Sequence, residues 1–113
     1  MTRLSKIAES TPAAVEDVLI RLGSSIRIAR LRRKLSLEQL SERIGISRYV
    51  LADIERGKPT TAIAAYLGAL WALGLLDEMR KVADPDRDEE GKILERARSP
   101  KTAPKRRAIE DDF

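Results

Sequence analysis

The segment from Ser47 to Lys58, SRYVLADIERGK, concentrates side chains suited to contacting a polyanion. If its apolar residues Val50, Leu51 and Ile54 face a core, the residues left facing outward or sideways are Ser47, Arg48, Tyr49, Ala52, Asp53 and Arg56. Arg48 can donate two hydrogen bonds to guanine O6 and N7, or it can hold a phosphate. The segment is therefore a candidate contact surface for nucleic acid.

The other polar residues of this segment also have two interpretations each. Tyr49 can offer its ring to a thymine methyl and its hydroxyl to phosphate, or it can pack over the preceding helix. Asp53 can accept a hydrogen bond from a cytosine amino group, or it can orient Arg56 one helical turn away. Arg56 and Lys58, at the end of the segment, suit phosphate.

The composition predicts one all-helical domain. The chain has 113 residues, with 42% hydrophobic but only 4% aromatic residues, and its apolar content is mostly Ala, Leu and Ile, which favour helices. Lys and Arg total 22 against 18 acidic residues, a net charge of +4, so a polyanionic partner is compatible with the charge.

Several functional classes are disfavoured. With no cysteine and no histidine, the chain has no disulfide, no thiolate or imidazole metal site and no histidine base, so we expect no metal, no cofactor and no enzymatic activity. No segment approaches the roughly 20 apolar residues of a membrane span, and the start, MTRLSKIAES, lacks a signal-peptide core. We therefore expect a soluble cytoplasmic protein without membrane contact.

Local signals predict where the helices begin and end. Thr11 and Pro12 suggest a helix capped by Thr11, and its apolar stripe runs unbroken through Gly23. The stripe consists of Val15, Val18, Leu19, Leu22, Ile26 and Ala29. The cations at positions 30 and 32–34 close this helix, where they suit the negative end of its dipole.

Two short helices follow. Ser36 and Gln39 form a capping box that opens the first, whose inner residues are Leu37, Leu40 and Ile44. Gly45 ends it. Ser47 caps the second, which Gly57 and Pro59 end. This spacing fits either a helix-turn-helix or an ordinary helical hairpin.

The rest of the chain is predicted to hold one more core helix and a charged extension. Thr60 or Thr61 should open an Ala-rich helix that ends near Gly74, with the apolar positions Ile63, Leu67, Leu70, Trp71 and Leu73. Further helical turns are expected over 75–83, a short helix over 85–98 and an unpacked tail over 99–113. The predicted organisation is an N-terminal arm (1–11), a domain (12–83) and a charged C-terminal extension (84–113).

Residues 22–76 resemble the Cro/repressor-type (XRE) DNA-binding domain. The residues that carry the resemblance are Gly23, Ile26, Arg30, Ser36, Leu40, Gly45, Ser47, Leu51, Ile54, Glu55, Gly57 and the run Ala72, Leu73 and Gly74. It implies a five-helix, all-α fold in which Arg30 and Glu55 form an ion pair. The chain departs from the pattern at Leu37, where a phosphate-binding Gln is common, and at Lys34, where a Gly often ends the first helix.

The resemblance also implies a binding mode. The second helix of the motif would lie in the major groove of double-stranded DNA, with Gln39, Ser47, Arg48, Tyr49, Asp53, Arg56 and Lys58 as the DNA-binding residues; Gln39 has capping as its alternative role. A homodimer on a palindromic operator, with half-sites about 34 Å apart, would supply specificity. The dimer or partner interface would use Trp71, Leu75, Leu76 and Met79, although Trp71 could instead close the core against the first long helix.

The stretch LGLLDEMRKVADPDRDEEGKILERARSPK resembles the C-terminal part of HipB-type antitoxins. That implies a repressor of its own operon which also binds a HipA-type kinase toxin and is nucleoid-associated when on its operator. A phage-type repressor without a toxin and a scaffold that only neutralises a partner are the alternatives. The basic tail, with Lys101, Lys105, Arg106 and Arg107, could contact phosphates, mark the chain for degradation, or simply be solvated.

Overall fold

The computed structural model describes residues 10–98, and this part of the chain is all-helical, as predicted. Its α-helices are α2 (Ala13–Arg32), α3 (Leu37–Ile44), α4 (Arg48–Arg56), α5 (Ile63–Leu73) and α6 (Glu89–Arg98). Two 3-10 helices, η1 (Leu76–Lys81) and η2 (Pro85–Arg87), lie between α5 and α6. Most of the predicted arm and the whole of the predicted tail, 99–113, lie outside the described residues.

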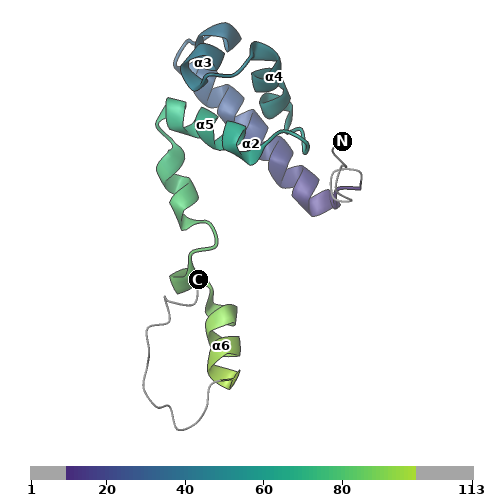
Figure 1. The fold of residues 1–113 in the computed structure, drawn as a ribbon, viewed down its shortest axis with the longest axis vertical. Coiled ribbons are helices and arrows are strands. Elements are labelled where there is room, and N and C mark those ends of the chain that lie inside the picture. The colour runs from purple at the N-terminus through teal and green to yellow at the C-terminus, as the bar shows by residue number, and fades with distance from the viewer. Residues whose placement is uncertain (1–9, 99–113) are drawn as a thin grey trace. The chain divides into compact units, whose positions relative to one another are not determined.

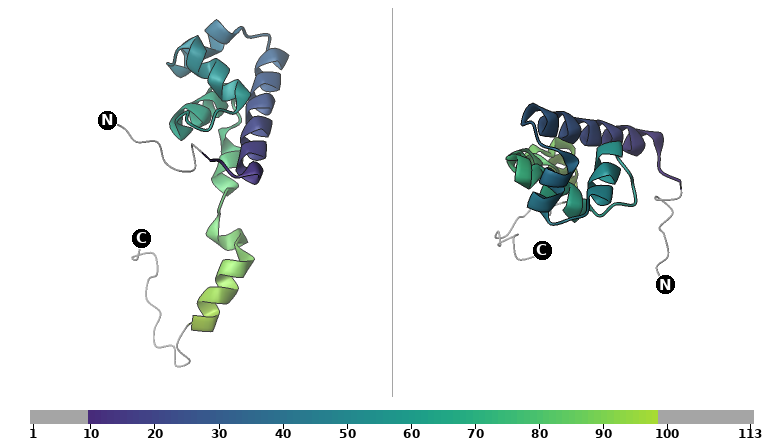
Figure 2. Two further views of the ribbon diagram at one scale, coloured as in Figure 1. Left: turned by 90° about the vertical axis from the view of Figure 1, so that its right-hand side faces the viewer. Right: turned by 90° about the horizontal axis from the view of Figure 1, so that it is seen from above.

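The chain divides into two compact units, Met1–Glu78 and Met79–Phe113. In the first unit, α2 packs mainly on α4, and α3 packs on both α4 and α5 (Figures 1 and 2). The largest fully buried side chains are Ile26 of α2, Leu40 of α3, and Leu51 and Ile54 of α4. The core of this unit therefore lies where α2, α3 and α4 meet, with α5 closing it.

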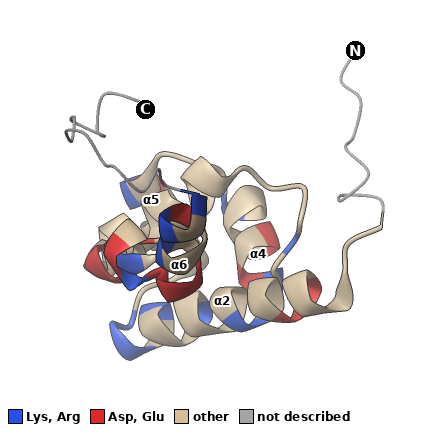
Figure 3. Cartoon of the chain, turned by 90° about the horizontal axis from the view of Figure 1, so that it is seen from below, with Lys and Arg blue, Asp and Glu red and all other residues tan. Residues whose placement is uncertain are grey.

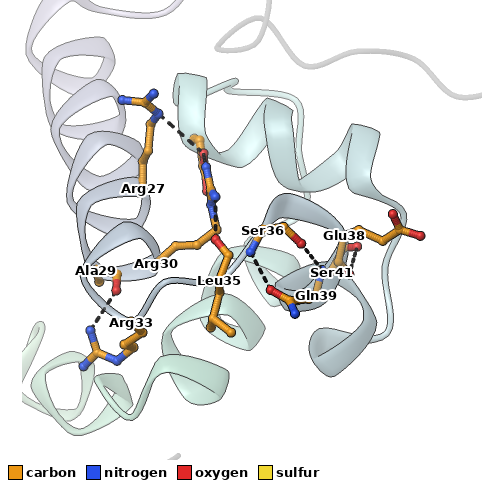
Figure 4. Close-up of polar contacts among 10 residues, drawn as sticks. Arg27, Ala29, Arg30, Arg33, Leu35, Ser36, Glu38, Gln39 and Ser41 are labelled. Carbon is orange, nitrogen blue, oxygen red and sulfur yellow. Dashed lines mark hydrogen bonds and ion pairs between the residues drawn. The ribbon is translucent and has the colours of Figure 1, made fainter.

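The predicted ends of the two short helices are confirmed. The Ser36 hydroxyl accepts a hydrogen bond from the Gln39 amide at 3.0 Å, and the Gln39 side chain accepts one from the Ser36 amide at 2.9 Å (Figure 4). Gly45 ends α3 in a left-handed conformation, with φ of 91°. The Ser47 hydroxyl then accepts from the Val50 amide at 3.1 Å, so α4 begins after a three-residue turn.

Two predicted helix starts are wrong. Helix α2 begins at Ala13, with Pro12 rather than Thr11 at the cap position, because the extended backbone of Pro12 (ψ 145°) stays outside the helix. Helix α5 begins at Ile63 after Ala62, without a side-chain cap from Thr60 or Thr61. Tertiary packing rather than a local cap therefore positions the start of α5.

The predicted inner faces of α2 and α5 are only partly right. Val15 and Val18 are exposed, and full burial on α2 begins at Gly23. On α5, Tyr66, Ala69, Leu70 and Leu73 are buried, whereas Trp71 is 62% and Ile63 is 70% exposed. The alternative in which Trp71 closes the core is therefore wrong. Because α5 is apolar on nearly all sides, periodicity does not select its inner face.

The end of α2 explains one departure from the family pattern. After α2 ends at Arg32, Lys34 adopts a positive φ of 57°, which costs a residue with a Cβ about 1–2 kcal/mol. Lys34 therefore occupies a left-handed position, the conformation in which a Gly is strained least.

The described part of the second unit contains η2 and α6. The Asp84 side chain caps η2 by accepting from the Asp86 amide at 3.0 Å, and the Asp88 carboxylate accepts from the Gly91 amide at 2.9 Å near the start of α6. The helix predicted over 85–98 is thus present, with a break at Asp88. None of the residues of α6 is buried.

Helices α2 and α4 approach each other so closely that their backbones touch. A Cβ atom on Gly23 would collide with the carbonyl oxygen of Ile54 and lie 2.7 Å from that of Glu55. At the end of α4, a Cβ on Gly57 would lie 2.6 Å from the carbonyl oxygen of Leu19. Two glycines therefore allow this contact, one on α2 and one directly after α4.

We expect Gly23→Ala to lower the free energy of unfolding by about 2–3 kcal/mol, because the obstructing atoms are backbone and cannot rotate away. This loss should appear in denaturant unfolding even though alanine favours a helix interior by about 1 kcal/mol. Gly68→Ala in α5 is the matched control. Its Cβ would meet only the Ile44 methyl at 3.0 Å, so equal losses in the two variants would contradict the close contact.

Candidate nucleic-acid interface

A buried ion pair holds α4 against α2. The Arg30 Nε donates to Glu55 Oε2 at 2.7 Å, and the Nη2 of the same guanidinium donates to Glu55 Oε1 at 3.0 Å. The two side chains are only 8% and 7% exposed. Arg30 also donates to the carbonyl oxygen of Leu35 at 2.8 Å, so one guanidinium joins α2, α4 and the segment before α3 (Figure 4). The predicted ion pair is present, and the contact with Leu35 was not predicted.

Arg27 is a second cation near the same carboxylate. Its Nε lies 4.0 Å from Glu55 Oε1 on the exposed side of the pair. At that distance and exposure its contribution is small. The orientation of α4 therefore depends on Arg30, whose two hydrogen bonds to Glu55 fix direction as well as distance.

The first turn of α4 presents Arg48 and Tyr49 to solvent. The Arg48 guanidinium lies 5.3 Å from the centre of the Tyr49 ring, a cation–π distance, and donates to the Tyr49 hydroxyl at 3.4 Å. Tyr49 is 71% exposed, which contradicts the alternative in which it packs over α3. The two side chains thus form an exposed and mutually ordered pair beside the N-terminus of the helix.

Two other predicted DNA-binding residues already serve as helix caps. The Ser47 hydroxyl accepts from the Val50 amide, and the Gln39 side-chain oxygen accepts from the Ser36 amide. The side-chain nitrogen of Gln39 and the hydroxyl hydrogen of Ser47 can still donate hydrogen bonds. Both residues can therefore contact a phosphate without losing their role as caps.

Around the end of α4 the predicted residues are paired with one another. The Asp53 carboxylate contacts a terminal nitrogen of Arg56 through one oxygen, and the Lys58 Nζ lies 3.5 Å from the other. Asp53 thus pairs with Arg56 one helical turn away, as its orienting interpretation predicts. Acidic and basic residues lie close together on α4 and in the segment after it (Figure 3).

Sequence reasoning missed Tyr66, which is only 3% exposed. Its hydroxyl donates to the carbonyl oxygen of Lys58 at 2.8 Å, which holds the segment after α4 against α5. Burial, and then the nearby charge of Asp53, raise the pKa of Tyr66 above its usual value. No local signal identifies this contact, because Lys58 and Tyr66 belong to different elements.

The residues predicted for a dimer or partner interface lie in both units. Trp71, Leu75 and Leu76 belong to the first and Met79 to the second. Trp71 and Leu75 are exposed, whereas Leu76 and Met79 are half-buried. Leu75 lines a shallow hollow in the surface. The other lining residues lie on α2 or directly after it: Ser25, Ile28, Ala29, Arg32 and Arg33. The exposed Ile28 gives one wall of this hollow an apolar surface.

Comparison with known proteins identifies the class of domain. Residues 26–67 match the family model described as helix-turn-helix, a segment that includes all of α3 and α4, the last part of α2 and the first part of α5. No curated protein and no solved structure matches the chain. Among residues 10–98, no helix has both the length and the apolar character needed to cross a bilayer.

The match and the arrangement of α3 and α4 together identify residues 26–67 as a helix-turn-helix domain. Such a domain is a DNA-binding module of transcription regulators and is not typically enzymatic.

We expect Glu55→Ala to lower the free energy of unfolding by about 3–5 kcal/mol, because it leaves the buried guanidinium of Arg30 without a counter-charge. Replacing both partners, with Arg30→Met and Glu55→Leu together, should cost much less because no unpaired charge stays in the core. Thermal unfolding of the three proteins measures this difference. An unchanged melting temperature for Glu55→Ala would show that the pair does not hold α4 in place.

Proposed function

We propose that this protein is a sequence-specific transcriptional repressor that places α4 in the major groove of its operator. The observation that carries the proposal is the Arg48–Tyr49 pair, exposed at the first turn of a helix that a buried ion pair holds in place. Recognition helices of this class contact bases mainly with their N-terminal residues. Arg48 would read guanine, and Tyr49 would contact a thymine methyl or a phosphate.

The remaining polar residues would position the helix on the backbone. The capping residues Ser47 and Gln39 would donate to phosphate, and Arg56 and Lys58 would supply charge at the other end of α4. Contacts of this kind set register and orientation but carry no sequence information. The number of bases read by one copy is therefore small.

We propose that two copies act as a dimer on a palindromic operator, with half-sites about 34 Å apart. The exposed indole of Trp71 and the neighbouring Leu75 support this proposal, because aromatic residues are enriched at the centre of protein interfaces. Leu76 would extend the same interface.

The narrower proposal is that the protein is the antitoxin of a HipA-type kinase toxin and represses its own operon in the cytoplasm. The resemblance over 73–101 supports it, and this stretch includes the exposed side chains of Ile93 and Leu94 on α6. A kinase reading frame next to the gene is the observation that tests this role. Its absence would favour a repressor without a toxin.

We expect Arg48→Ala combined with Tyr49→Ala to weaken operator binding by at least about 2 kcal/mol, or roughly 30-fold, because one good base contact contributes about 1–3 kcal/mol. The operator would first be obtained by selection from randomised duplexes with the wild-type protein. Affinity would then be measured by gel shift or fluorescence anisotropy, with circular dichroism as the test of folding.

Arg21→Ala is the matched control, since Arg21 is an exposed arginine on α2 whose Nε lies 3.0 Å from Asp17 Oδ2 on the same helix. It removes the same charge as Arg48→Ala and should leave operator binding nearly unchanged. If the double variant of α4 binds the operator like wild type, the proposed groove contact is wrong and the scaffold alternative is favoured.

We expect Trp71→Glu to shift the protein from dimer to monomer in analytical ultracentrifugation, because a charge would have to be buried in the interface. Stability of the monomer should change little, since Trp71 is exposed. Ile63→Glu, at an even more exposed position of the same helix, should leave the dimer intact. Equal behaviour of the two variants would show that the interface lies elsewhere.

A further inference from the structure

The cations at the end of α4 have an internal acidic partner. Asp53 lies on α4 itself, and its two carboxylate oxygens face different cations, Arg56 on one side and Lys58 on the other. The Asp53 side chain is 24% exposed, much less than those of Arg56 and Lys58, at 67% and 48%. The Asp53 side chain is therefore less exposed to solvent than those of its two cationic partners.

This arrangement is held by contacts that do not involve the three charges. The Lys58 amide donates to the Asp53 carbonyl oxygen at 3.0 Å, and Gly57 reverses the chain between them with φ of 76°. The Tyr66 hydroxyl donates to the carbonyl oxygen of Lys58. These contacts fix the backbone of Lys58 relative to Asp53 independently of the ion pairs between the side chains.

The Asp53 carboxylate and a DNA phosphate are ligands of the same kind for Arg56 and Lys58. Both groups offer negatively charged oxygens to guanidinium and ammonium donors. An Arg56 or Lys58 side chain that bonds a phosphate must give up part of its contact with Asp53, or hold both anions near each other at a cost in repulsion. In either case Asp53 weakens the contact of these cations with DNA.

We propose that Asp53 is an internal counter-ion that competes with the DNA backbone for Arg56 and Lys58. This inference rests on the proposed function, because it assumes that α4 faces DNA. Asp53 is then a positioning residue that lowers affinity for duplexes of any sequence, rather than a reader of cytosine. Its benefit is that less of the protein is held on DNA that lacks the operator.

The competition predicts a particular effect on salt dependence. Binding that depends on phosphate contacts weakens with salt by a slope of about 0.9 log units per contact. If Asp53 masks both Arg56 and Lys58, the Asp53→Asn protein should gain up to two phosphate contacts. The slope for Asp53→Asn should therefore be steeper than that of wild type by about 0.9–1.8.

The test compares Asp53→Asn with wild type on a random-sequence duplex and on the selected operator, over a series of salt concentrations. We expect Asp53→Asn to bind both duplexes more tightly, by about 3–10-fold at low salt, with the steeper slope. Adding Arg56→Gln and Lys58→Gln should remove the gain, because the released cations are then absent.

Asp17→Asn is the control for net charge. Asp17 also pairs with an arginine on its own helix, at 3.0 Å from Arg21, and its loss changes the total charge by the same amount. Asp17→Asn should leave the slope unchanged. An equal increase in both variants would show that net charge, rather than masking of these two cations, sets the affinity.

The other outcomes are equally distinct. If Asp53→Asn loses affinity for the operator alone, Asp53 reads a base and the inference is wrong. If the wild-type protein binds DNA and Asp53→Asn changes neither affinity nor slope, the inference fails while the proposed function stands. If the wild-type protein binds no duplex, the proposed function fails and the inference with it.

Discussion

The contact between α2 and α4 is the constraint on which the rest of the first unit depends. A nine-residue helix such as α4 is too short to be stable alone in water, so its orientation must come from what it packs on. Gly23 allows the two backbones to touch, and the Arg30–Glu55 ion pair fixes how far α4 turns about its own axis. The direction in which Arg48 and Tyr49 point is a consequence of this contact.

The two ends of α4 differ in a way that suits separate tasks. At its start, Arg48 and Tyr49 order each other and leave most of the tyrosine ring in solvent. At its end, Arg56 and Lys58 share the Asp53 carboxylate. Base reading requires donors that are free and well oriented, whereas backbone contacts tolerate competition because they supply charge rather than selectivity. The distribution of charge along the helix is consistent with that division.

Residues beyond the first unit have a different character. The described part of the second unit has helix caps, at Asp84 and Asp88, but α6 has no buried residue. Its local signals specify where a helix begins without specifying what that helix packs on. The apolar side chains of Ile93 and Leu94 on α6 are accordingly exposed.

The sequence by itself determined the features that depend on neighbours within about one helical turn. The capping box of Ser36 and Gln39, the left-handed stop at Gly45 and the cap at Ser47 are all confirmed, because each is a contact between residues three or four positions apart. The ion pair between Arg30 and Glu55 spans 25 positions, and only the resemblance to a known family made it predictable.

The tertiary structure alone decided which faces are buried. Helix α5 is apolar on nearly every side, so its packing on α3 selected Tyr66 for the core and left Trp71 outside. Val15 and Val18 continue the stripe of α2 past the point where the core ends, and periodicity carries no information on where a neighbour stops. The placement of Asp53 between Arg56 and Lys58 likewise depends on the chain reversal at Gly57 and on the hydroxyl of Tyr66, a contact between separate elements.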